Sequence, residues 1–335
     1  MGDFEPTRRA VLPLLGLPLL APAGAQAFEE AAGWADQRDA RGASVRRELE
    51  KAVGTKLVLL GTGAGPVAGR ARQMASSLIV RGAKAHIVDC GLGVTDLFMR
   101  TGVPFRAVES IFLTHHHPDH NIEYGPFLLL GWLRGLPRQL AAYGPPPLAQ
   151  MTTDYVRAMA GTTAMWARDF HLADFSAPQV HEIPASGVVL HTRDLTVRAV
   201  AVDHPPVDLA LAYRFDFPDR SIVFSGDTRA SDNLTALAAG ADILVHEAIH
   251  LPGIERQARE QVAGGLAMTP ADFVQHIARA HTPIGDVGKI AQRAGVGTLV
   301  LSHIYPDDVA AEVWRDEAAK VFKGDIIVAS DLTIV

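Results

Sequence analysis

The chain has 335 residues, of which 48% are hydrophobic and 20% charged, a composition typical of a globular protein with a large core. The formal net charge is −6 at pH 7, so no overall positive field attracts nucleic acid or anionic lipid. The single cysteine, Cys90, excludes an intramolecular disulfide, and we expect it to be a small buried hydrophobe.

The first residues have the layout of a twin-arginine export signal. Arg8 and Arg9 precede an apolar stretch over residues 11–23, and small residues suited to cleavage follow up to Ala27. Prolines interrupt the stretch, which is shorter than the roughly 20 apolar residues that a membrane-spanning helix needs. We therefore expect residues 1–27 to be an export signal, the protein to be periplasmic or secreted, and no segment to span a membrane.

The domain is expected to begin after a charged, alanine-rich segment. Residues 28–55 are interpreted as a helix or a loose lead-in, and residues 56–335 as the domain itself. Its first strand, residues 56–60, runs into the glycine loop Gly61-Thr62-Gly63-Ala64-Gly65. No helix with the acidic partner of a dinucleotide site follows at the needed distance. We predict instead that the loop lets the backbone pass close to a metal site.

The remaining pattern predicts strands and helices in two successive groups. The first group has strands over residues 77–80, 85–88, 111–113 and 141–144 and helices over 94–100 and 148–166; the second has strands over 188–191, 195–202, 209–217 and 221–224. Alternating apolar and polar residues in the second group are typical of an antiparallel, half-buried sheet. We predict one α/β (α+β) domain of four layers, with two sheets face to face and helices outside.

A dense group of metal-type side chains follows the apolar run that ends at Leu113. Pro118 stops the strand, so the histidines of the next residues fall in the loop at its C-terminal end, where open α/β sheets place ligands. Imidazole and carboxylate suit a divalent metal such as Zn²⁺, and four of them in six residues seldom serve packing alone. The candidate ligands are His115, His117, Asp119 and His120.

Three later strand patterns also end in side chains that can bind metal. Residues 197–202 lead to His204, residues 222–224 to Asp227, and residues 299–301 to His303. With the first group they make seven candidate ligands, five of them imidazoles, which is what a two-metal site requires.

In these stretches the chain resembles the metallo-β-lactamase superfamily, in particular its ribonuclease Z-like branch, which includes tRNA 3′-processing endonucleases and zinc arylsulfatases. The resemblance implies a single-domain αββα sandwich and a metal-dependent hydrolase that acts on ester bonds. The matching stretches span nearly all of the chain after the signal, in family order: residues 60–65, 88–91, 114–120, 143–145, 204, 224–228, 244–248, 281 and 302–303.

The resemblance also implies a ligand set for two divalent ions. These are expected to be Zn²⁺, with iron or manganese as alternatives because no thiolate is present among the ligands. One ion would be held by His115, His117 and His204, the other by Asp119, His120 and His303, and Asp227 would bridge both. Asp89 would steady the ligand loop by hydrogen bonds.

Three further residues resemble positions that take part in the chemistry of the branch. Glu247 would orient His246, which could then protonate a leaving group; a buried structural role for His246 is the alternative. His281 would line the pocket and is the second candidate for the proton donor. Asp119 would orient the nucleophile as well as bind metal.

The other histidines are not assigned to the site. The alternation of side chains turns His116 away from the ligands, and we expect it to support them or to face solvent. Six more match no motif position and are expected to be ordinary surface or strand residues: His86, His171, His181, His191, His250 and His276.

The sequence says more about the machinery than about the substrate. A hydroxide that bridges two ions can attack phosphorus, sulfur or a carbonyl carbon near neutral pH. The tRNA-processing members of the branch carry an inserted arm between the third histidine and the bridging aspartate, whereas residues 205–226 here have room only for a strand, a turn and a strand. With the acidic charge and the export signal, this favours a small sulfate or phosphate ester, as in the arylsulfatases, and makes nucleic acid an unlikely partner.

Alternatives remain open at this point. The same machinery suits a phosphodiesterase or ribonuclease Z-like endonuclease, and a lactonase-type carboxylic-ester hydrolase. The alternative outside enzymes is an inactive metal-binding protein. Nothing in the sequence fixes the oligomeric state, for which a homodimer is one option.

Overall fold

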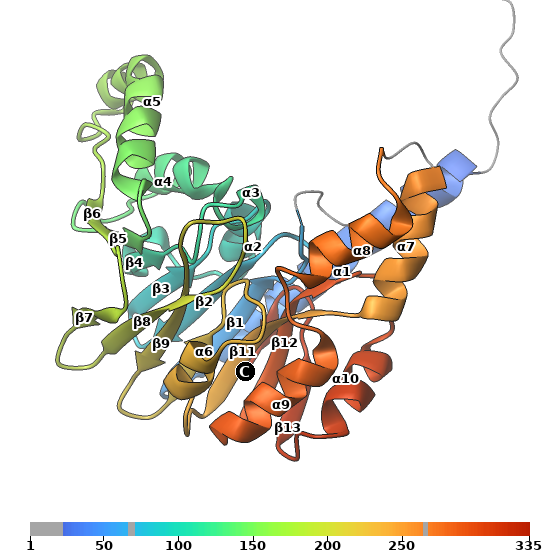
Figure 1. The fold of residues 1–335 in the computed structure, drawn as a ribbon. Coiled ribbons are helices and arrows are strands. Elements are labelled where there is room, and N and C mark those ends of the chain that lie inside the picture. The colour runs from blue at the N-terminus through green and yellow to red at the C-terminus, as the bar shows by residue number, and fades with distance from the viewer. Residues whose placement is uncertain (1–22, 66–70, 264–266) are drawn as a thin grey trace, which may run out of the picture. The chain divides into compact units, whose positions relative to one another are not determined.

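The computed structural model describes residues 23–65, 71–263 and 267–335 (Figure 1). Helix α1 (Ala23–Glu50) crosses the division between a unit that ends at Gln37 and the compact unit Arg38–Val335, which carries everything discussed below. The twin-arginine pair of the predicted export signal lies outside the described residues. Among the described helices, none combines the length and the apolar character needed to cross a membrane.

The first sheet has seven strands in the order β14-β1-β2-β3-β4-β5-β6. Strands β3 to β6 run parallel, while β14, β1, β2 and β3 pair antiparallel. Parallel strands end at the same edge of a sheet, so the loop after β4 opens at an edge that also receives the loops after β3 and β5. The bounds are β1 (Thr55–Gly61), β2 (Ser76–Arg81), β3 (Lys84–Val88), β4 (Val108–Phe112), β5 (Ala141–Gly144), β6 (Gln179–Glu182) and β14 (Thr333–Ile334).

The second sheet also has seven strands, in the order β13-β12-β11-β10-β9-β8-β7. Strands β7 to β10 pair antiparallel, as predicted, whereas β10 to β13 are parallel. The bounds are β7 (Gly187–His191), β8 (Thr196–Val202), β9 (Ala210–Asp216), β10 (Ser221–Phe224), β11 (Ile243–Ile249), β12 (Thr298–Tyr305) and β13 (Asp325–Val328).

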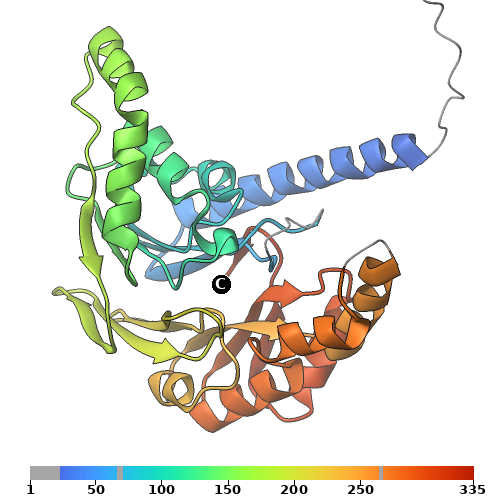
Figure 2. The same ribbon diagram turned by 45° about the horizontal axis from the view of Figure 1, so that its top comes forward.

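Helices cover the outer faces of both sheets (Figures 1 and 2). Some begin at clear signals: Ser231 caps α6 by accepting a hydrogen bond from the Leu234 N–H, and Thr269 caps α8 in front of Pro270. The bounds are α2 (Val94–Arg100), the 3-10 helix η1 (Phe105–Ala107), α3 (Pro118–Asn121), α4 (Tyr124–Trp132), α5 (Leu148–Phe170), α6 (Asp232–Leu237), α7 (Leu251–Ala263), α8 (Pro270–Ala278), α9 (Ile284–Ala294) and α10 (Ala311–Ala319).

The apolar core lies in three layers, which confirms the predicted αββα sandwich. Strand β1 illustrates why its sequence is continuously apolar: Leu57 and Leu59 pack between the two sheets, whereas Val58 and Leu60 pack against the outer helices. On the far side of the second sheet, the fully buried Trp314 of α10 packs in a third cluster with residues of α6 and α9.

Three findings add to the predicted organisation. The lead-in is helical, and Val45 near the end of α1 is buried in the core of the domain. Cys90 is buried and belongs to the same cluster, as predicted for a small hydrophobe. The last strand, β14, returns to the first sheet, where Ile334 pairs with Val58. A strand of two residues has no periodicity of its own, so the sequence pattern gave no sign of it.

The turn after β10 requires glycine and sets the direction of the residue that follows it. Gly226 has a φ of +57°, and a Cβ atom there would lie 2.7 Å from the Leu211 carbonyl oxygen. We expect Gly226→Ala to lower the free energy of unfolding by about 1–3 kcal/mol, measured by urea denaturation followed by circular dichroism.

Gly285→Ala is the matched control for this substitution. Gly285 lies in α9, where an added methyl group meets no other part of the chain within 4 Å. This variant should be neutral or more stable by up to about 1 kcal/mol, because alanine favours helix. Equal destabilisation by both substitutions would contradict a specific requirement at Gly226.

Candidate metal centre

Both sheets deliver polar side chains to one edge, where their strands end. The loop after β4 carries His115 and His117, and the short helix α3 that follows carries Asp119 and His120. The other three come from the second sheet: His204 lies just beyond β8, Asp227 just beyond β10, and His303 near the end of β12. All seven candidate ligands predicted from the sequence therefore meet in the structure.

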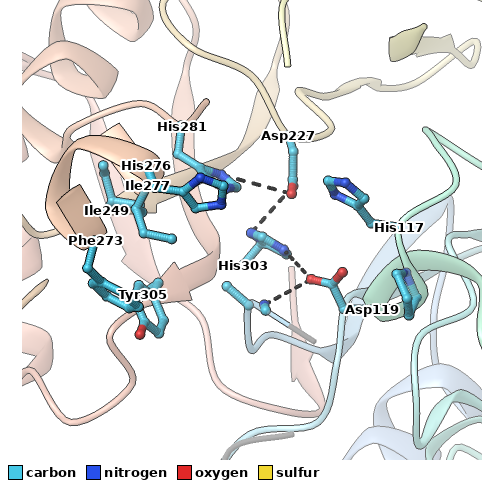
Figure 3. Close-up of a pocket in the computed structure, with 13 residues that line it drawn as sticks. His117, Asp119, Asp227, Ile249, Phe273, His276, Ile277, His281, His303 and Tyr305 are labelled. Carbon is cyan, nitrogen blue, oxygen red and sulfur yellow. Dashed lines mark hydrogen bonds and ion pairs between the residues drawn. The ribbon is translucent and has the colours of Figure 1, made fainter. Parts of the chain in front are cut away.

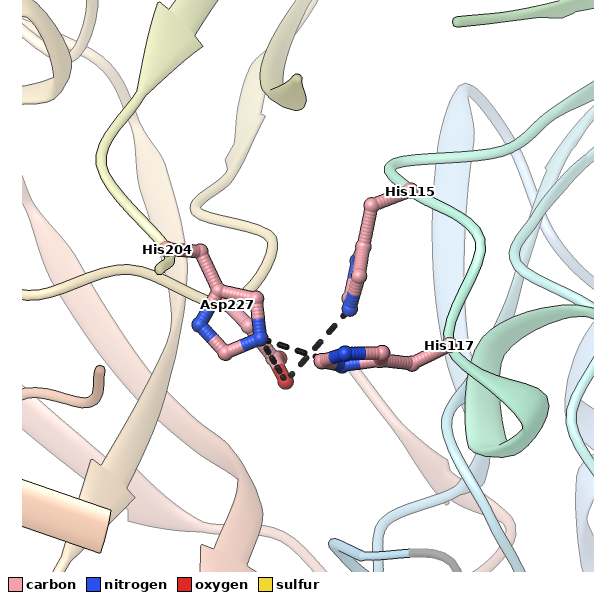
Figure 4. A group of neighbouring side chains, drawn as sticks. All are labelled: His115, His117, His204 and Asp227. Atoms are coloured by element: carbon pink, nitrogen blue, oxygen red, sulfur yellow. Dashed lines mark hydrogen bonds and ion pairs between the residues drawn. The ribbon is translucent and has the colours of Figure 1, made fainter. Parts of the chain in front are cut away.

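Four of these residues form the first cluster. One ligand atom from each of His115, His117, His204 and Asp227 lies within 4.8 Å of every other (Figure 4). His204 Nε2 is 3.1 Å from His117 Nδ1 and 3.7 Å from Asp227 Oδ2. His115 Nε2 is 3.8 Å from the same carboxylate oxygen. Three imidazole nitrogens and one carboxylate oxygen thus converge on one point.

A second cluster shares the same aspartate. Ligand atoms of Asp119, His120, Asp227 and His303 also lie within 4.8 Å of one another. His303 Nε2 is 3.1 Å from both Asp119 Oδ2 and His120 Nε2. His120 Nε2 and His303 Nδ1 lie 3.3 and 3.4 Å from Asp227 Oδ1. The two oxygens of Asp227 therefore face different clusters, which is the geometry of a bridging carboxylate.

The donor atoms fit divalent cations. His115 Nε2, Asp227 Oδ1 and His303 Nδ1 are buried without a hydrogen-bond partner, an arrangement that costs stability unless a ligand satisfies them. The opposite nitrogens of two rings are engaged: His120 Nδ1 lies 2.8 Å from Asp89 Oδ2, and His204 Nδ1 lies 2.8 Å from the Ala280 carbonyl oxygen. Metal-binding histidines are held in this way, because the outer contact fixes the ring and its tautomer.

Two structural residues hold the ligand loop in place. Asp89 Oδ1 accepts a hydrogen bond from the Thr114 N–H at 2.8 Å while its other oxygen contacts His120, which are contacts of the kind implied for this aspartate. The Gly65 N–H donates to Asp119 Oδ2 at 2.9 Å. The glycine loop after β1 therefore lies against the site, as predicted.

Burial favours the neutral form of three of the imidazoles, while the carboxylates favour added positive charge. Burial lowers the pKa of His115 well below its usual value, and burial also lowers the pKa of His117 and His204. Neutral imidazole is the form that binds metal. Burial alone would lower the pKa of His120, but the carboxylates of Asp227, Asp89 and Asp119 outweigh it and raise that pKa.

Glu247 contacts a different histidine from the one expected. Its carboxylate lies 3.2 Å from His281 Nδ1 and accepts hydrogen bonds from the backbone N–H groups of Thr228 and Thr282. His246 is fully buried, and its Nδ1 contacts only the backbone carbonyl of Glu247. Neighbouring residues of a strand point to opposite faces, so Glu247 faces the site while His246 faces away.

The environment of His281 follows from this contact. Burial alone would lower its pKa, but the negative charge of Glu247 and the nearby Asp227 raise the pKa to about 9. Glu247 and His281 thus form the carboxylate–imidazole pair that the sequence placed at Glu247 and His246.

A cavity of about 370 Å³ opens beside the two clusters (Figure 3). Metal-type residues form its polar side, and His281 lies on the other side with apolar residues of β11, β12 and α8. His276 also lines it, although this histidine matches no motif position. The labelled lining residues are His117, Asp119, Asp227 and His303 on the polar side, and Ile249, Phe273, His276, Ile277, His281 and Tyr305 on the other side.

The remaining histidines lie outside the two ligand clusters. His116 contacts the Pro145 carbonyl oxygen at 2.8 Å and the Asn121 side chain, so its ring braces the loop after β5 instead of joining the ligands. His86 is buried in β3 against the Ser110 hydroxyl. His276 could have been found from its spacing, since it lies three residues after Phe273 and one before Ile277, on one face of a helix.

Comparison with known proteins adds three findings. Residues 86–304 match the family described as the beta-lactamase superfamily domain. A ribonuclease Z from Mycobacterium bovis is 34% identical over 285 residues, covering 83% of this chain and 96% of that protein. Two solved structures share the fold: a metallo-beta-lactamase fold protein from Bacillus subtilis (TM-score 0.62, 20% identity) and the short form of human tRNase Z (TM-score 0.61, 19% identity). Each comparison covers 84% of this chain and 98% of the other.

The shared carboxylate gives a direct test of the centre. Asp227→Ala should lower the bound divalent metal from two ions per chain to one or none, because both clusters lose a ligand. Metal content is measured by elemental analysis after reconstitution with zinc and gel filtration. Asp194→Ala, at an exposed position between β7 and β8, is the control. If the Asp227 variant retained two ions, this residue would not be the ligand that both clusters share.

Proposed function

Because the chain belongs to the metallo-β-lactamase superfamily, in its ribonuclease Z-like branch, we propose that this metal-dependent hydrolase cleaves phosphodiester bonds with two bound divalent ions. The observation that carries the proposal is the single carboxylate, Asp227, shared by two complete ligand clusters. Zinc is the metal that this donor set suits first, with iron or manganese as alternatives. When bound, a pair of such ions polarises the phosphoryl oxygen and lowers the pKa of water.

The chain's own residues supply positioning and a proton. Asp119 is held by the Gly65 N–H, which keeps its carboxylate in one orientation at the cavity and suits it to orient an attacking water. Glu247 holds Nδ1 of His281, which leaves the other ring nitrogen to give a proton to the leaving oxygen. His246 has no place in this scheme because it does not reach the cavity.

The choice of substrate shifts from the sulfate ester favoured by the sequence to a phosphodiester. The relative that matches 34% of positions is named ribonuclease Z. The match spans 285 residues and 83% of this chain, so that relative carries no long insertion compared with it. The short interval over residues 205–226 therefore does not separate this chain from proteins of that name, and the argument against nucleic acid loses its main support.

A small aryl ester, sulfate or phosphate, is the second candidate. The apolar side of the cavity favours it, because an enclosed wall with Phe273 and Ile277 suits a compact aromatic molecule. Export through the twin-arginine route is a separate proposal that rests on the sequence of residues 1–27 alone.

Relative rates on matched substrates test the proposal. The zinc-loaded protein is assayed with bis-p-nitrophenyl phosphate, p-nitrophenyl sulfate and p-nitrophenyl acetate, and with an RNA that carries a 3′ extension. We expect kcat/KM for the phosphodiester to exceed that for the sulfate by at least roughly tenfold, since each tenfold step needs only about 1.4 kcal/mol of transition-state preference. A preference for the sulfate would support the second candidate instead.

The role of His281 is tested with two leaving groups. His281→Ala should slow a diester with an alkoxide leaving group by roughly 10²–10⁴-fold, because general-acid catalysis contributes this much when the leaving oxygen is basic. A p-nitrophenyl diester needs little protonation and should slow far less. His191→Ala, on the exposed strand β7, controls for loss of an imidazole. Equal slowing of both diesters would mean that His281 positions the site without donating a proton.

A further inference from the structure

Helix α8 places an apolar stripe next to the candidate metal centre. The stripe consists of Phe273 and Ile277, which are four residues apart, and His276 lies on the same face of the helix. All three line the cavity (Figure 3). A surface helix normally buries its apolar stripe against the core, yet α8 has no fully buried residue. The face that would be buried in another helix is here turned to the cavity.

The cavity therefore has two chemically different sides. The metal-type ligands His117, Asp119, Asp227 and His303 form one side (Figure 3). The stripe of α8 faces them together with Ile249 of β11 and Tyr305 of β12, which extend the apolar surface. A molecule that fills this space needs an anionic group at one end and an uncharged apolar group at the other.

The chain fixes α8 relative to both the ligands and the proposed proton donor. Two residues after the end of α8, the Ala280 carbonyl oxygen contacts Nδ1 of the ligand His204 at 2.8 Å. The next residue is His281, which Glu247 holds. A proton donor must lie beside the leaving oxygen, so the leaving group lies on the side of His281. That side is also the side of α8 (Figure 3).

We propose that Phe273 and Ile277 of α8 form a specificity wall that binds an uncharged aromatic ring carried by the leaving group. This inference rests on the proposed function, because it assigns one end of the ester that the centre would cleave. An aryl ring and a nucleobase share the required chemistry: each is planar, and each packs on aromatic and branched aliphatic side chains. Phe273 and Ile277 are therefore specificity-determining residues, while the metal-type ligands hold the phosphoryl group.

Binding of two simple anions tests the wall without any turnover. Phenylphosphonate and methylphosphonate carry the same head group and differ in the ring. The zinc-loaded full chain should bind phenylphosphonate at least roughly tenfold more tightly than methylphosphonate. Phe273→Ala should reduce this ratio to below about threefold, because the ring then loses the stacking contact that provides most of the preference. Affinities are measured by isothermal titration calorimetry.

Val274→Ala is the matched control. Val274 is half-buried on the same helix and is not one of the residues that line the cavity. This variant should keep the tenfold ratio. Ile277→Ala, the second test variant, should lower the ratio as Phe273→Ala does, and circular dichroism checks that each variant folds. The proposal would be overturned if the wild-type protein did not prefer phenylphosphonate, or if Val274→Ala lowered the ratio of affinities as much as Phe273→Ala does.

Further measurements identify which kind of molecule carries the ring, and they separate this inference from the proposed function. Uridine 5′-monophosphate compared with ribose 5-phosphate tells whether a nucleobase occupies the wall as well as phenyl does. Turnover is tested with two methyl phosphodiesters, one with phenol and one with hexafluoroisopropanol as the leaving group. These two alcohols have similar acidities, but only phenol carries a ring. Phe273→Ala should slow only the phenyl ester.

The two ideas fail in different ways. If no phosphodiester is hydrolysed but the phenyl preference exists and depends on Phe273, the proposed function fails and the wall stands. If diesters are hydrolysed and the ratio of affinities is near one in the wild-type protein, the wall fails and the proposed function stands.

Discussion

The structure of the site depends on one carboxylate that two sheets bring within reach of two groups of histidines. The loop after β4 belongs to the first sheet, while His204 and Asp227 follow strands of the second and His303 lies near the end of one. Asp227 can face both clusters only because the sheets pack with their strand ends at a common edge. The glycine before it, with its positive φ, and the hydrogen bonds of Asp89 then fix the two sides of the site.

Buried polar atoms without partners connect this geometry to stability. Imidazole and carboxylate groups at the centre of a domain are costly to bury, and the cost is recovered when a cation occupies the space between them. Metal binding to the folded chain would therefore stabilise it by an amount that grows with the logarithm of the affinity of the site. The apolar side of the cavity has a different cost, because the apolar stripe of α8 stays uncovered beside the polar metal-type residues.

Much of this arrangement could be predicted from the sequence, because the ligands lie at or beyond the ends of strands whose apolar runs are easy to recognise. The pairing of Glu247 with His281 was missed although a signal existed: adjacent strand residues point to opposite faces, so His246 and Glu247 could not both reach the site. The spacing of three and four residues in α8 is a second signal, because it indicates that Phe273, His276 and Ile277 share one face of the helix. The two-residue strand β14 has no recognisable signal in the sequence. The choice of substrate depends on the residues that line the cavity, and motifs at the ends of strands do not describe these residues.

The central claim is that two ions share Asp227, and anomalous scattering tests it most directly. Crystals of the zinc-loaded protein would be measured on both sides of the zinc absorption edge. The account predicts two anomalous peaks per chain, one among His115, His117, His204 and Asp227 and the other among Asp119, His120, Asp227 and His303. A single peak, or peaks away from these clusters, would contradict it.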